Sequence, residues 1–294
     1  MHRSGFVNII GNPNVGKSSL MNVLTGERLS AVTAKAQTTR HRIMGIISGD
    51  DFQIVFSDTP GIIKPKYKMQ EGMMDFVRTA FTDADMIVYV TDVVETAEKN
   101  AAYINKISGM DIPVILVINK IDLATPEKLD LLSDYWKNLL PQAIVIPTSA
   151  KEKFNIETLN AAIRNFLPEG PAYYPKDELT DKPERFFASE ILRGRIFENY
   201  DKEIPYCCEV VVESFKENQN IIHIHMVIFV ERDTQKGIII GKKGTALKRT
   251  ATQARREMER FFDKKIFLET YVKVRKDWRN DEKYLKNFGY INRT

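Results

Sequence analysis

The chain has 294 residues, which corresponds to about two domains at roughly 150 residues each. Its 43% hydrophobic and 28% charged residues are ordinary for a folded protein and exclude a disordered or collagen-like chain. The net charge of +4 is uneven, because residues 236–276 have 13 Lys and Arg against 4 Asp and Glu. This excess indicates a polyanionic partner, either nucleic acid or an anionic membrane, although a solvated helix face has the same composition.

The cysteines and the apolar runs bear on the compartment. The 2 cysteines, Cys207 and Cys208, are adjacent, which excludes a disulfide framework. The apolar runs fall short of the roughly 18 residues of a bilayer-spanning helix. Gly11-Asn12-Pro13 interrupts the first apolar run, so that it does not read as a signal peptide. We expect a cytoplasmic protein.

The first half of the chain alternates short apolar runs with amphipathic stretches. Strands are predicted at Val7–Ile10, Ile43–Ile47, Gln53–Phe56, Met86–Val90, Val114–Ile118 and Ala143–Ile146. Helices are predicted at Lys17–Leu24, Gly72–Phe81, Glu98–Ile107, Pro126–Leu140 and Ile156–Phe166. This alternation predicts an α/β fold with a parallel, doubly wound sheet, in which ligands bind at the carboxyl ends of the strands.

The second half has a different pattern. A stretch rich in proline, residues 169–182, is predicted to link a domain over 1–168 to a smaller α+β domain over 183–276. Its predicted elements are a helix at Glu184–Phe197, strands at Cys207–Phe215 and Ile221–Val230, a helix at Thr245–Phe262 and a strand at Ile266–Val274. A helical tail is expected over 277–294, with its helix at Asp277–Phe288.

Residues 11–18, with the sequence GNPNVGKS, fit the phosphate-loop motif G-x-x-x-x-G-K-[ST] between a predicted strand and a helix. Glycines let successive backbone N–H groups face one anion, and the helix that follows adds its positive end. Lys17 can reach the β- and γ-phosphates, and the Ser18 hydroxyl can bind Mg²⁺. The predicted phosphate-binding residues are Gly11, Asn12, Pro13, Asn14, Val15, Gly16, Lys17, Ser18 and Ser19.

Two further motifs select the base. Asn119-Lys120-Ile121-Asp122 directly follows a predicted strand, and the carboxylate of Asp122 can accept hydrogen bonds from guanine N1–H and the 2-amino group together. Adenine lacks that amino group, so a site built on this pair rejects it. Asn119 can bridge the base and the phosphate loop, and the Lys120 stem can pack on the nucleotide. Ser149-Ala150-Lys151 offers a backbone N–H for guanine O6.

Two segments are predicted to respond to the γ-phosphate. Asp58-Thr59-Pro60-Gly61 ends a strand, where Asp58 can hold Mg²⁺ through water and the Gly61 backbone can approach the phosphate. The other segment contains Gln37-Thr38-Thr39-Arg40, and a threonine hydroxyl there can complete the Mg²⁺ shell when GTP is bound. We expect both to be ordered by GTP and released on hydrolysis.

These motifs together resemble those of the translation-factor-related GTPases over residues 5–167. The resemblance implies that Thr39 is the Mg²⁺ ligand of the first switch, with Thr38 beside it. It also implies that Asn14 matches the asparagine of potassium-dependent members, so K⁺ is a candidate cofactor. Ile62 occupies the position of the water-orienting glutamine of other GTPases, which predicts slow intrinsic hydrolysis.

The basic segment contains a second glycine turn. Gly241-Lys242-Lys243-Gly244 opens the predicted basic helix, as in the GXXG loop of a KH domain that clamps about four nucleotides of single-stranded nucleic acid. The isoleucines before the turn are expected to line the groove for the bases. The predicted RNA-binding residues are Ile238, Ile239, Ile240, Gly241, Lys242, Lys243, Gly244, Lys248, Arg249 and Arg255, with Arg256 beside them.

A GTPase domain joined to one C-terminal KH domain of type II resembles the Era family of bacterial GTPases over essentially the whole chain. That resemblance implies a role in small-subunit ribosome maturation, with the KH domain binding the 3′ end of the small-subunit rRNA. It also implies a monomer that associates loosely with the cytoplasmic face of the cell membrane. The expected cofactors are GTP or GDP and Mg²⁺.

Two other functions remain compatible with the residues. One is a membrane-linked signalling switch whose basic domain binds acidic lipids. The other is a tRNA-modification or translation GTPase, which the single GTPase domain followed directly by a KH module disfavours.

Overall fold

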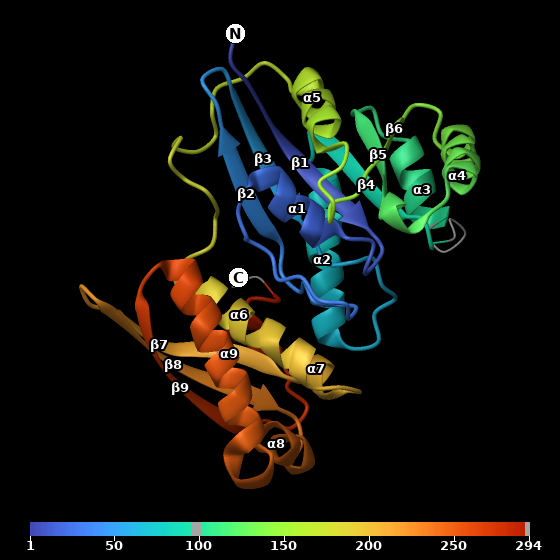
Figure 1. Ribbon diagram of the computed structural model, residues 1–294. Coiled ribbons are helices and arrows are strands. Elements are labelled where there is room, and N and C mark those ends of the chain that lie inside the picture. Colours follow the sequence, from blue (N-terminus) through green and yellow to red (C-terminus); the bar gives the residue numbers. More distant parts are fainter. Residues whose placement is uncertain (96–100, 292–294) are drawn as a thin grey trace. The chain divides into compact units, whose positions relative to one another are not determined.

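The computed structural model describes residues 1–95 and 101–291, which divide into two compact units (Figure 1). The first unit comprises Met1–Ser30, Thr39–Lys64 and Met73–Asp181. The second comprises Ala31–Thr38, Pro65–Gly72 and Lys182–Thr294. Two short segments from the first half of the chain therefore group with its C-terminal part.

The first unit contains a six-stranded sheet with the order β2-β3-β1-β4-β5-β6. Its strands are β1 (Arg3–Gly11), β2 (Ile43–Ser48), β3 (Phe52–Asp58), β4 (Met86–Asp92), β5 (Val114–Asn119) and β6 (Ile144–Pro147). All neighbours pair in parallel except β2 and β3, which are antiparallel, so the expectation of a purely parallel sheet was wrong at this edge. A three-residue turn joins these two strands, and parallel strands need a much longer crossover.

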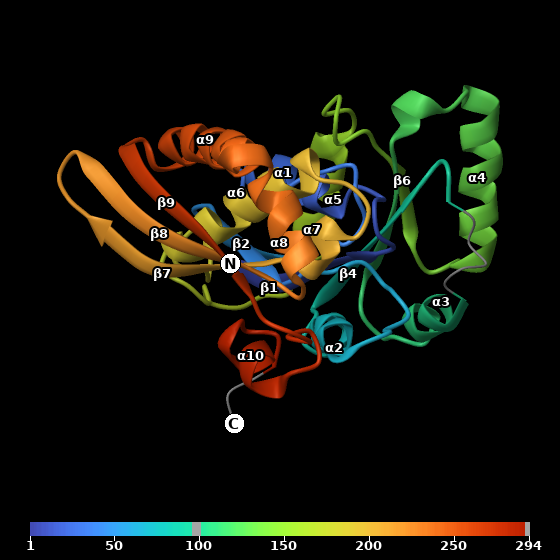
Figure 2. The same ribbon diagram turned by 90° about the horizontal axis from the view of Figure 1, so that it is seen from below.

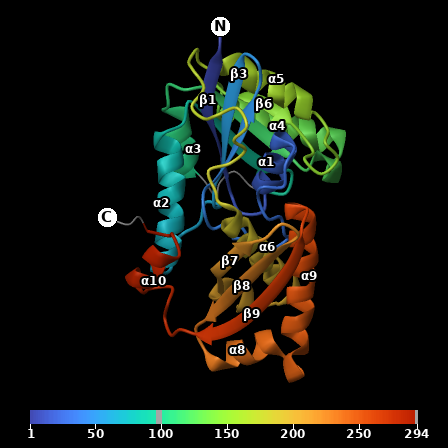
Figure 3. The ribbon, with the colours of Figure 1, turned by 90° about the vertical axis from the view of Figure 1, so that its left-hand side faces the viewer.

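Helices cover both faces of this sheet, with α2 and α3 on one face and α1 and α5 on the other (Figure 3). The helices are α1 (Lys17–Thr25), α2 (Lys68–Thr82), α3 (Ala101–Ser108), α4 (Pro126–Leu139) and α5 (Ile156–Phe166), with a short 3-10 turn at Ile121–Leu123. Helix α2 begins four residues before its expected start at Gly72. The predicted start of α3 at residue 98 lies outside the described residues.

The predicted linker packs along β2 and β3 for most of its length. The side-chain amide of Gln53 accepts hydrogen bonds from the backbone N–H groups of Tyr173 and Tyr174, at 2.7 and 3.0 Å. The N–H of Ile46 donates to the carbonyl of Leu179 at 2.9 Å. Residues up to Asp181 therefore group with the first unit.

The second unit contains a three-stranded sheet with the order β7-β8-β9. Its strands are β7 (Glu209–Glu217), β8 (Ile221–Val230) and β9 (Lys265–Val274). Its helices are α6 (Glu184–Asn199), α7 (Ile204–Cys207), α8 (Asp233–Ile240), α9 (Thr245–Phe262) and α10 (Glu282–Asn287), with a 3-10 turn at Lys242–Gly244. Helices α6 and α9 lie on one face of the sheet, and α10 lies on the other (Figure 2).

Three local expectations for the second unit were wrong. The strand predicted from Cys207 begins at Glu209, because the N–H of Cys207 donates to the carbonyl of Glu203 and closes the helical turn α7. Helix α8 was not expected, since its isoleucines were assigned to a turn. The tail helix is six residues long, and Asp281 caps it through hydrogen bonds from the N–H groups of Lys283 and Tyr284.

The core of the second unit lies between its sheet and the helices α6, α8 and α9. Leu192 and Ile196 of α6, together with Ala254 and Met258 of α9, pack against the isoleucines on the inner side of β8. Burial of these side chains holds α9, and with it the glycine turn at its start, on the sheet.

Candidate nucleotide site and nucleic-acid interface

The phosphate loop connects β1 to α1, at the carboxyl end of a central strand. Gly16 has a left-handed backbone with φ of 94°, and a Cβ there would lie 2.2 Å from Nδ2 of Asn119. Only glycine combines this backbone with so close an approach. The loop therefore presents the N-terminus of α1 to an anion, as the motif predicts.

Lys17 begins α1 with its side chain buried, and its Nζ donates to the carbonyl of Asn12 at 2.7 Å. Burial lowers the pKa of Lys17 from 10.5 to about 8, against the opposing influence of the Asp58 and Glu95 carboxylates. Burial also raises the pKa of Asp58. Two buried, opposite charges held ready in one place are expected where a charged ligand completes the site.

Three oxygens converge at the start of α1. The hydroxyl of Ser18 lies 2.8 Å from the hydroxyl of Thr39 and 2.7 Å from Oδ2 of Asp58. Oδ1 of Asp58 is fully buried and has no hydrogen-bond partner. A hard cation such as Mg²⁺ prefers oxygen ligands and would satisfy this orphaned oxygen. The arrangement therefore fits the predicted Mg²⁺ site, while the described residues contain no cluster of His, Cys, Asp and Glu suited to another metal.

The two residues before Thr39 take other roles, and they group with the second unit. The hydroxyl of Thr38 donates to the carbonyl of Lys35 at 2.7 Å. Oε1 of Gln37 accepts a hydrogen bond from Nε2 of Gln70 at 3.0 Å. Thr39, and not Thr38, is therefore the threonine placed for the metal.

Asn119 ties the phosphate loop to the loop after β6. Its Nδ2 donates to the carbonyl of Val15 at 2.8 Å, and its Oδ1 accepts from the N–H of Ala150 at 3.0 Å. The Ala150 N–H, which the sequence assigned to guanine O6, is thus used by Asn119. Asn119 is buried and links three of the predicted motifs at once.

Asp122 stands at the surface with one carboxylate oxygen held in place. The hydroxyl of Ser149 donates to its Oδ1 at 2.7 Å, which fixes the carboxylate after β5. A carboxylate oriented in this way can accept from the two N–H groups on one edge of guanine. Lys151 is exposed in the same loop.

Asp92 is a residue that the sequence did not indicate. It ends β4, and its Oδ2 lies 2.6 Å from Nζ of Lys120 in a partly buried ion pair. Lys120 also donates to the carbonyl of Asn14, whose exposed backbone has φ of 66°. The signal was a carboxylate at the carboxyl end of an apolar strand, where ligand-binding residues of such sheets lie.

The segment after β3 packs against the phosphate loop. A Cβ on Gly61 would lie 2.6 Å from the nitrogen of Pro13, so the two backbones are in close contact. The hydroxyl of Thr59 donates to the carbonyl of Ile9 and is not available to a nucleotide. Pro60, beside it, is also buried. Ile62 is buried in the core, as expected of a side chain that orients no water.

The glycine turn of the second unit joins α8 to α9. Gly241 and Gly244 have positive φ angles of 70° and 78°, and Lys242 and Lys243 between them are exposed. A backbone presented at the start of a helix, flanked by two lysines, can approach a phosphate chain closely.

The isoleucines before this turn differ in exposure. Ile238 is 51% exposed and Ile240 is half-buried. Ile239 is fully buried in the core of the unit, so its assignment to the RNA surface was wrong. Successive residues of α8 point to different sides of the helix, and only part of the apolar run can face a ligand.

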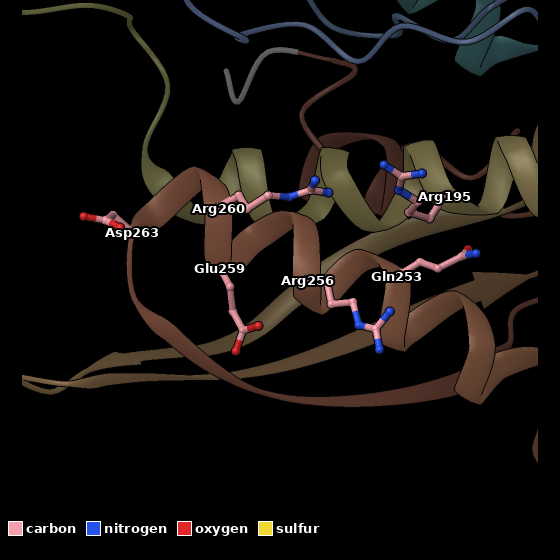
Figure 4. A pocket seen from close by; sticks show the side chains of 6 residues that line it. All are labelled: Arg195, Gln253, Arg256, Glu259, Arg260 and Asp263. Carbon is pink, nitrogen blue, oxygen red and sulfur yellow. The ribbon is translucent and has the colours of Figure 1, made fainter.

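Helix α9 carries a basic surface away from its core face. Lys248, Arg249 and Arg256 are exposed, whereas Arg255 is turned toward Glu259 and forms an ion pair with it at 2.7 Å. Arg256 and Arg260 line an open pocket of about 700 Å³ beside α6 (Figure 4). The other residues of this pocket are Arg195, Gln253, Glu259 and Asp263. Exposed arginines along one helix that starts at the GXXG loop make a continuous surface for phosphates.

Three comparisons bear on these sites. A family model described as a 50S ribosome-binding GTPase matches residues 6–120, and one described as a KH domain matches residues 203–279. GTPase Era of Geobacter sp. (strain M21) is 47% identical over 291 residues, which cover 98% of each chain. Among the described residues, no helix is long and apolar enough to span a membrane.

Two solved structures are similar over nearly the whole chain. A variant of Era from Aquifex aeolicus bound to GDP and AlF₄⁻ is 36% identical, covers 98% of this chain and 99% of its own, and has a TM-score of 0.94. Era in complex with MgGDPNP and nucleotides 1506–1542 of 16S ribosomal RNA is 37% identical, covers 99% of both chains and also has a TM-score of 0.94.

Proposed function

The chain belongs to the Era family of GTPases, and on that premise we propose that it binds the 3′ end of the small-subunit rRNA and acts in the biogenesis of the small ribosomal subunit. One observation carries the proposal: a complete guanine-nucleotide site occurs in the same chain as a GXXG loop that opens an exposed basic helix. The structure of an Era relative with a 16S rRNA fragment supports the same reading.

The chain is a GTPase, and its own residues account for the recognition of the nucleotide. The phosphate loop and Lys17 bind the phosphates, and Asp122 accepts from the guanine edge. Ser18 and Thr39 would hold Mg²⁺, with Asp58 acting through water, and the ion would supply charge neutralisation at the phosphates. Ile62 has no polar atom, so the attacking water must be oriented by the backbone near Gly61. We therefore propose slow intrinsic hydrolysis, with Asn14 as the candidate ligand of a K⁺ ion.

The second unit supplies the RNA surface. Lys242 and Lys243 would clamp the backbone of the single strand, and exposed Ile238 would contact its bases. Lys248, Arg249, Arg256 and Arg260 would bind the phosphates that continue along α9. Arg255 contributes less, because its charge is shared with Glu259.

The remaining parts of the proposal concern the setting of the protein. We propose that it works as a monomer in the cytoplasm, that it joins immature small subunits in its GTP form, and that it associates weakly with the inner membrane surface. The support for the membrane contact is the positive charge of residues 236–276, which anionic lipids also attract.

The test measures binding of the full chain to immature small subunits in the presence of GDPNP and of GDP. We expect tight binding with GDPNP, and a loss of that binding in the doubly substituted K242D/K243D variant. A matched control, K216D/K265D, makes the same change of charge at exposed lysines of β7 and β9 and should bind normally. Equal binding by both double variants would contradict the GXXG assignment. Preference for anionic vesicles over pyrimidine-rich single strands would instead favour the membrane-linked switch.

A further inference from the structure

The segment after β9 is a fixed part of the second unit, although only six of its residues are helical. Trp278 is fully buried, and its Nε1 donates to the carbonyl of Cys207 at 3.1 Å. Tyr290 is buried, and its hydroxyl donates to Oε2 of Glu209 at 2.6 Å. Anchors at both ends hold the residues between them against the sheet. We call residues 277–290 the tail.

The tail caps the first turn of α2. The first N–H groups of an α-helix have no partner within the helix and need acceptors from outside. The N–H of Lys68 donates to Oδ1 of Asn280 at 3.2 Å, and the N–H of Met69 donates to the carbonyl of Arg279 at 2.9 Å. Both acceptors lie more than 200 positions further along the chain, and α10 lies beside the start of α2 in the views of Figures 2 and 3.

Side chains reinforce this cap. The guanidinium of Arg279 lies 4.5 Å from the centre of the Tyr67 ring and forms an ion pair with Glu231. The Nζ of Lys68 lies 2.8 Å from Oε1 of Glu282, although both side chains are exposed and this pair contributes little. The stacked and paired Arg279 is the better anchored contact, because it is held from two sides.

Gly72 provides a steric match at the end of the capped turn. A Cβ there would lie 2.5 Å from the carbonyl oxygen of Tyr290, so no side chain fits without movement of one backbone. A glycine in a helix normally costs stability relative to alanine. Its presence here is explained by the close approach of the tail.

We propose that the tail positions the second switch, and that Arg279 and Asn280 are positioning residues for GTP hydrolysis. Residues 65–72 follow Gly61 in the chain after only three residues, so the conformation of the first turn of α2 constrains the backbone that packs on the phosphate loop. Thr39 and Gly61 are closed on that loop in this structure. The cap therefore belongs to the GTP-like arrangement, and its loss should disfavour that arrangement. This inference rests on the GTPase activity stated above.

The first test compares Asn280→Ala with Asn218→Ala, which removes an exposed asparagine from the β7–β8 turn. Removal of one N-cap acceptor should shift the equilibrium of the switch about fivefold. We expect Asn280→Ala to lower kcat and to weaken GDPNP binding about fivefold relative to GDP, with KM for GTP and unfolding temperature nearly unchanged. Asn218→Ala should match the parent protein in all of these measurements.

The second test uses Arg279 and Gly72. Arg279→Ala should lower kcat more than Asn280→Ala does, and Arg279→Lys should recover part of it by keeping a cation over Tyr67. Gly72→Ala should also lower kcat, whereas Gly237→Ala in α8, where the added methyl meets nothing within 4 Å, should not.

The outcome can separate this proposal from the function on which it rests. A parent protein without GTP hydrolysis would contradict the function. A parent protein that hydrolyses GTP, together with Asn280→Ala and Arg279→Ala variants that keep its kcat and its GDPNP to GDP affinity ratio, would overturn the proposal alone. Hydrogen exchange at the Met69 amide would establish that the cap had been released in those variants.

Discussion

The hydroxyl of Ser18 in the phosphate loop lies 2.8 Å from the hydroxyl of Thr39 in the first switch segment, and Asp58 accepts from both. These three residues come from α1, the segment before β2, and the end of β3. Their only shared chemistry is oxygen, and the second oxygen of Asp58 is buried without a partner. The site is therefore assembled to bind one cation from three distant parts of the chain.

Thr39→Ala should weaken binding of GDPNP with Mg²⁺ by roughly tenfold, because a charge-assisted contact of a buried hydroxyl is lost. Binding of GDP should hardly change, since this threonine is needed when a γ-phosphate is present. Thr39→Ser keeps the hydroxyl and serves as the control. Fluorescent-nucleotide titrations measure both affinities, and an equal loss for GDP and GDPNP would contradict the assignment of Thr39 to the switch.

Asp122→Asn should lower the affinity for GDP by a factor of about 10² or more, because the guanine amino and N1–H groups lose a carboxylate acceptor. Xanthine has a carbonyl in place of the 2-amino group, and an asparagine amide can donate to it. We expect the variant to bind xanthosine diphosphate better than GDP. Asp134→Asn, an exposed residue on α4 with no place in the site, is the matched control, and competition titrations give both affinities.

Much of the nucleotide site follows from the sequence because each of its motifs is local. Lys17, Asp58, Asn119 and Asp122 each come just after an apolar strand, and parallel strands bring their carboxyl ends to one edge. The sequence could not assign the individual hydrogen bonds. Asn119 uses the Ala150 N–H, an arrangement that depends on how close two loops approach in space.

The second unit was less predictable for the same physical reason. The run Ile238–Ile240 is apolar throughout, so hydrophobicity alone cannot separate the buried Ile239 from the exposed Ile238. The tail has a helical composition, but Trp278 and Tyr290 fix it through tertiary contacts, and only a short helix forms between them. Packing between distant residues decided both cases.

Lys17 predicts a pH dependence of nucleotide binding. Its pKa is lowered to about 8 by burial in the free protein, and a bound phosphate restores the charged form. Binding of GDP in EDTA should therefore take up a proton above pH 8, and the affinity should fall as the pH rises from 8 toward 10. Calorimetry in buffers of different ionisation enthalpy measures this uptake. An affinity that stays constant over that range would contradict the prediction.

The same lowered pKa affects the stability of the nucleotide-free protein in the opposite sense. Between pH 8 and the unfolded value of 10.5, the unfolded chain binds more protons at Lys17 than the folded chain does. The free energy of unfolding contributed by this group therefore rises with pH in that window. Lys17→Met removes the titrating group, so the difference in unfolding free energy between the parent and this variant should change in that window.

Arg255 and Arg256 are neighbours on α9 with different surroundings, and they offer a matched pair for the RNA surface. Arg255 forms an ion pair with Glu259, and Arg256 projects from the exposed side of the helix. Arg256→Ala should weaken binding of single-stranded RNA several-fold and reduce the slope of log affinity against log salt by about 0.7. Arg255→Ala should leave that slope nearly unchanged and cost about 0.5 kcal/mol of stability through the lost i,i+4 pair. If both variants lowered the salt slope equally, the exposed stripe of α9 would not be the path of the phosphates.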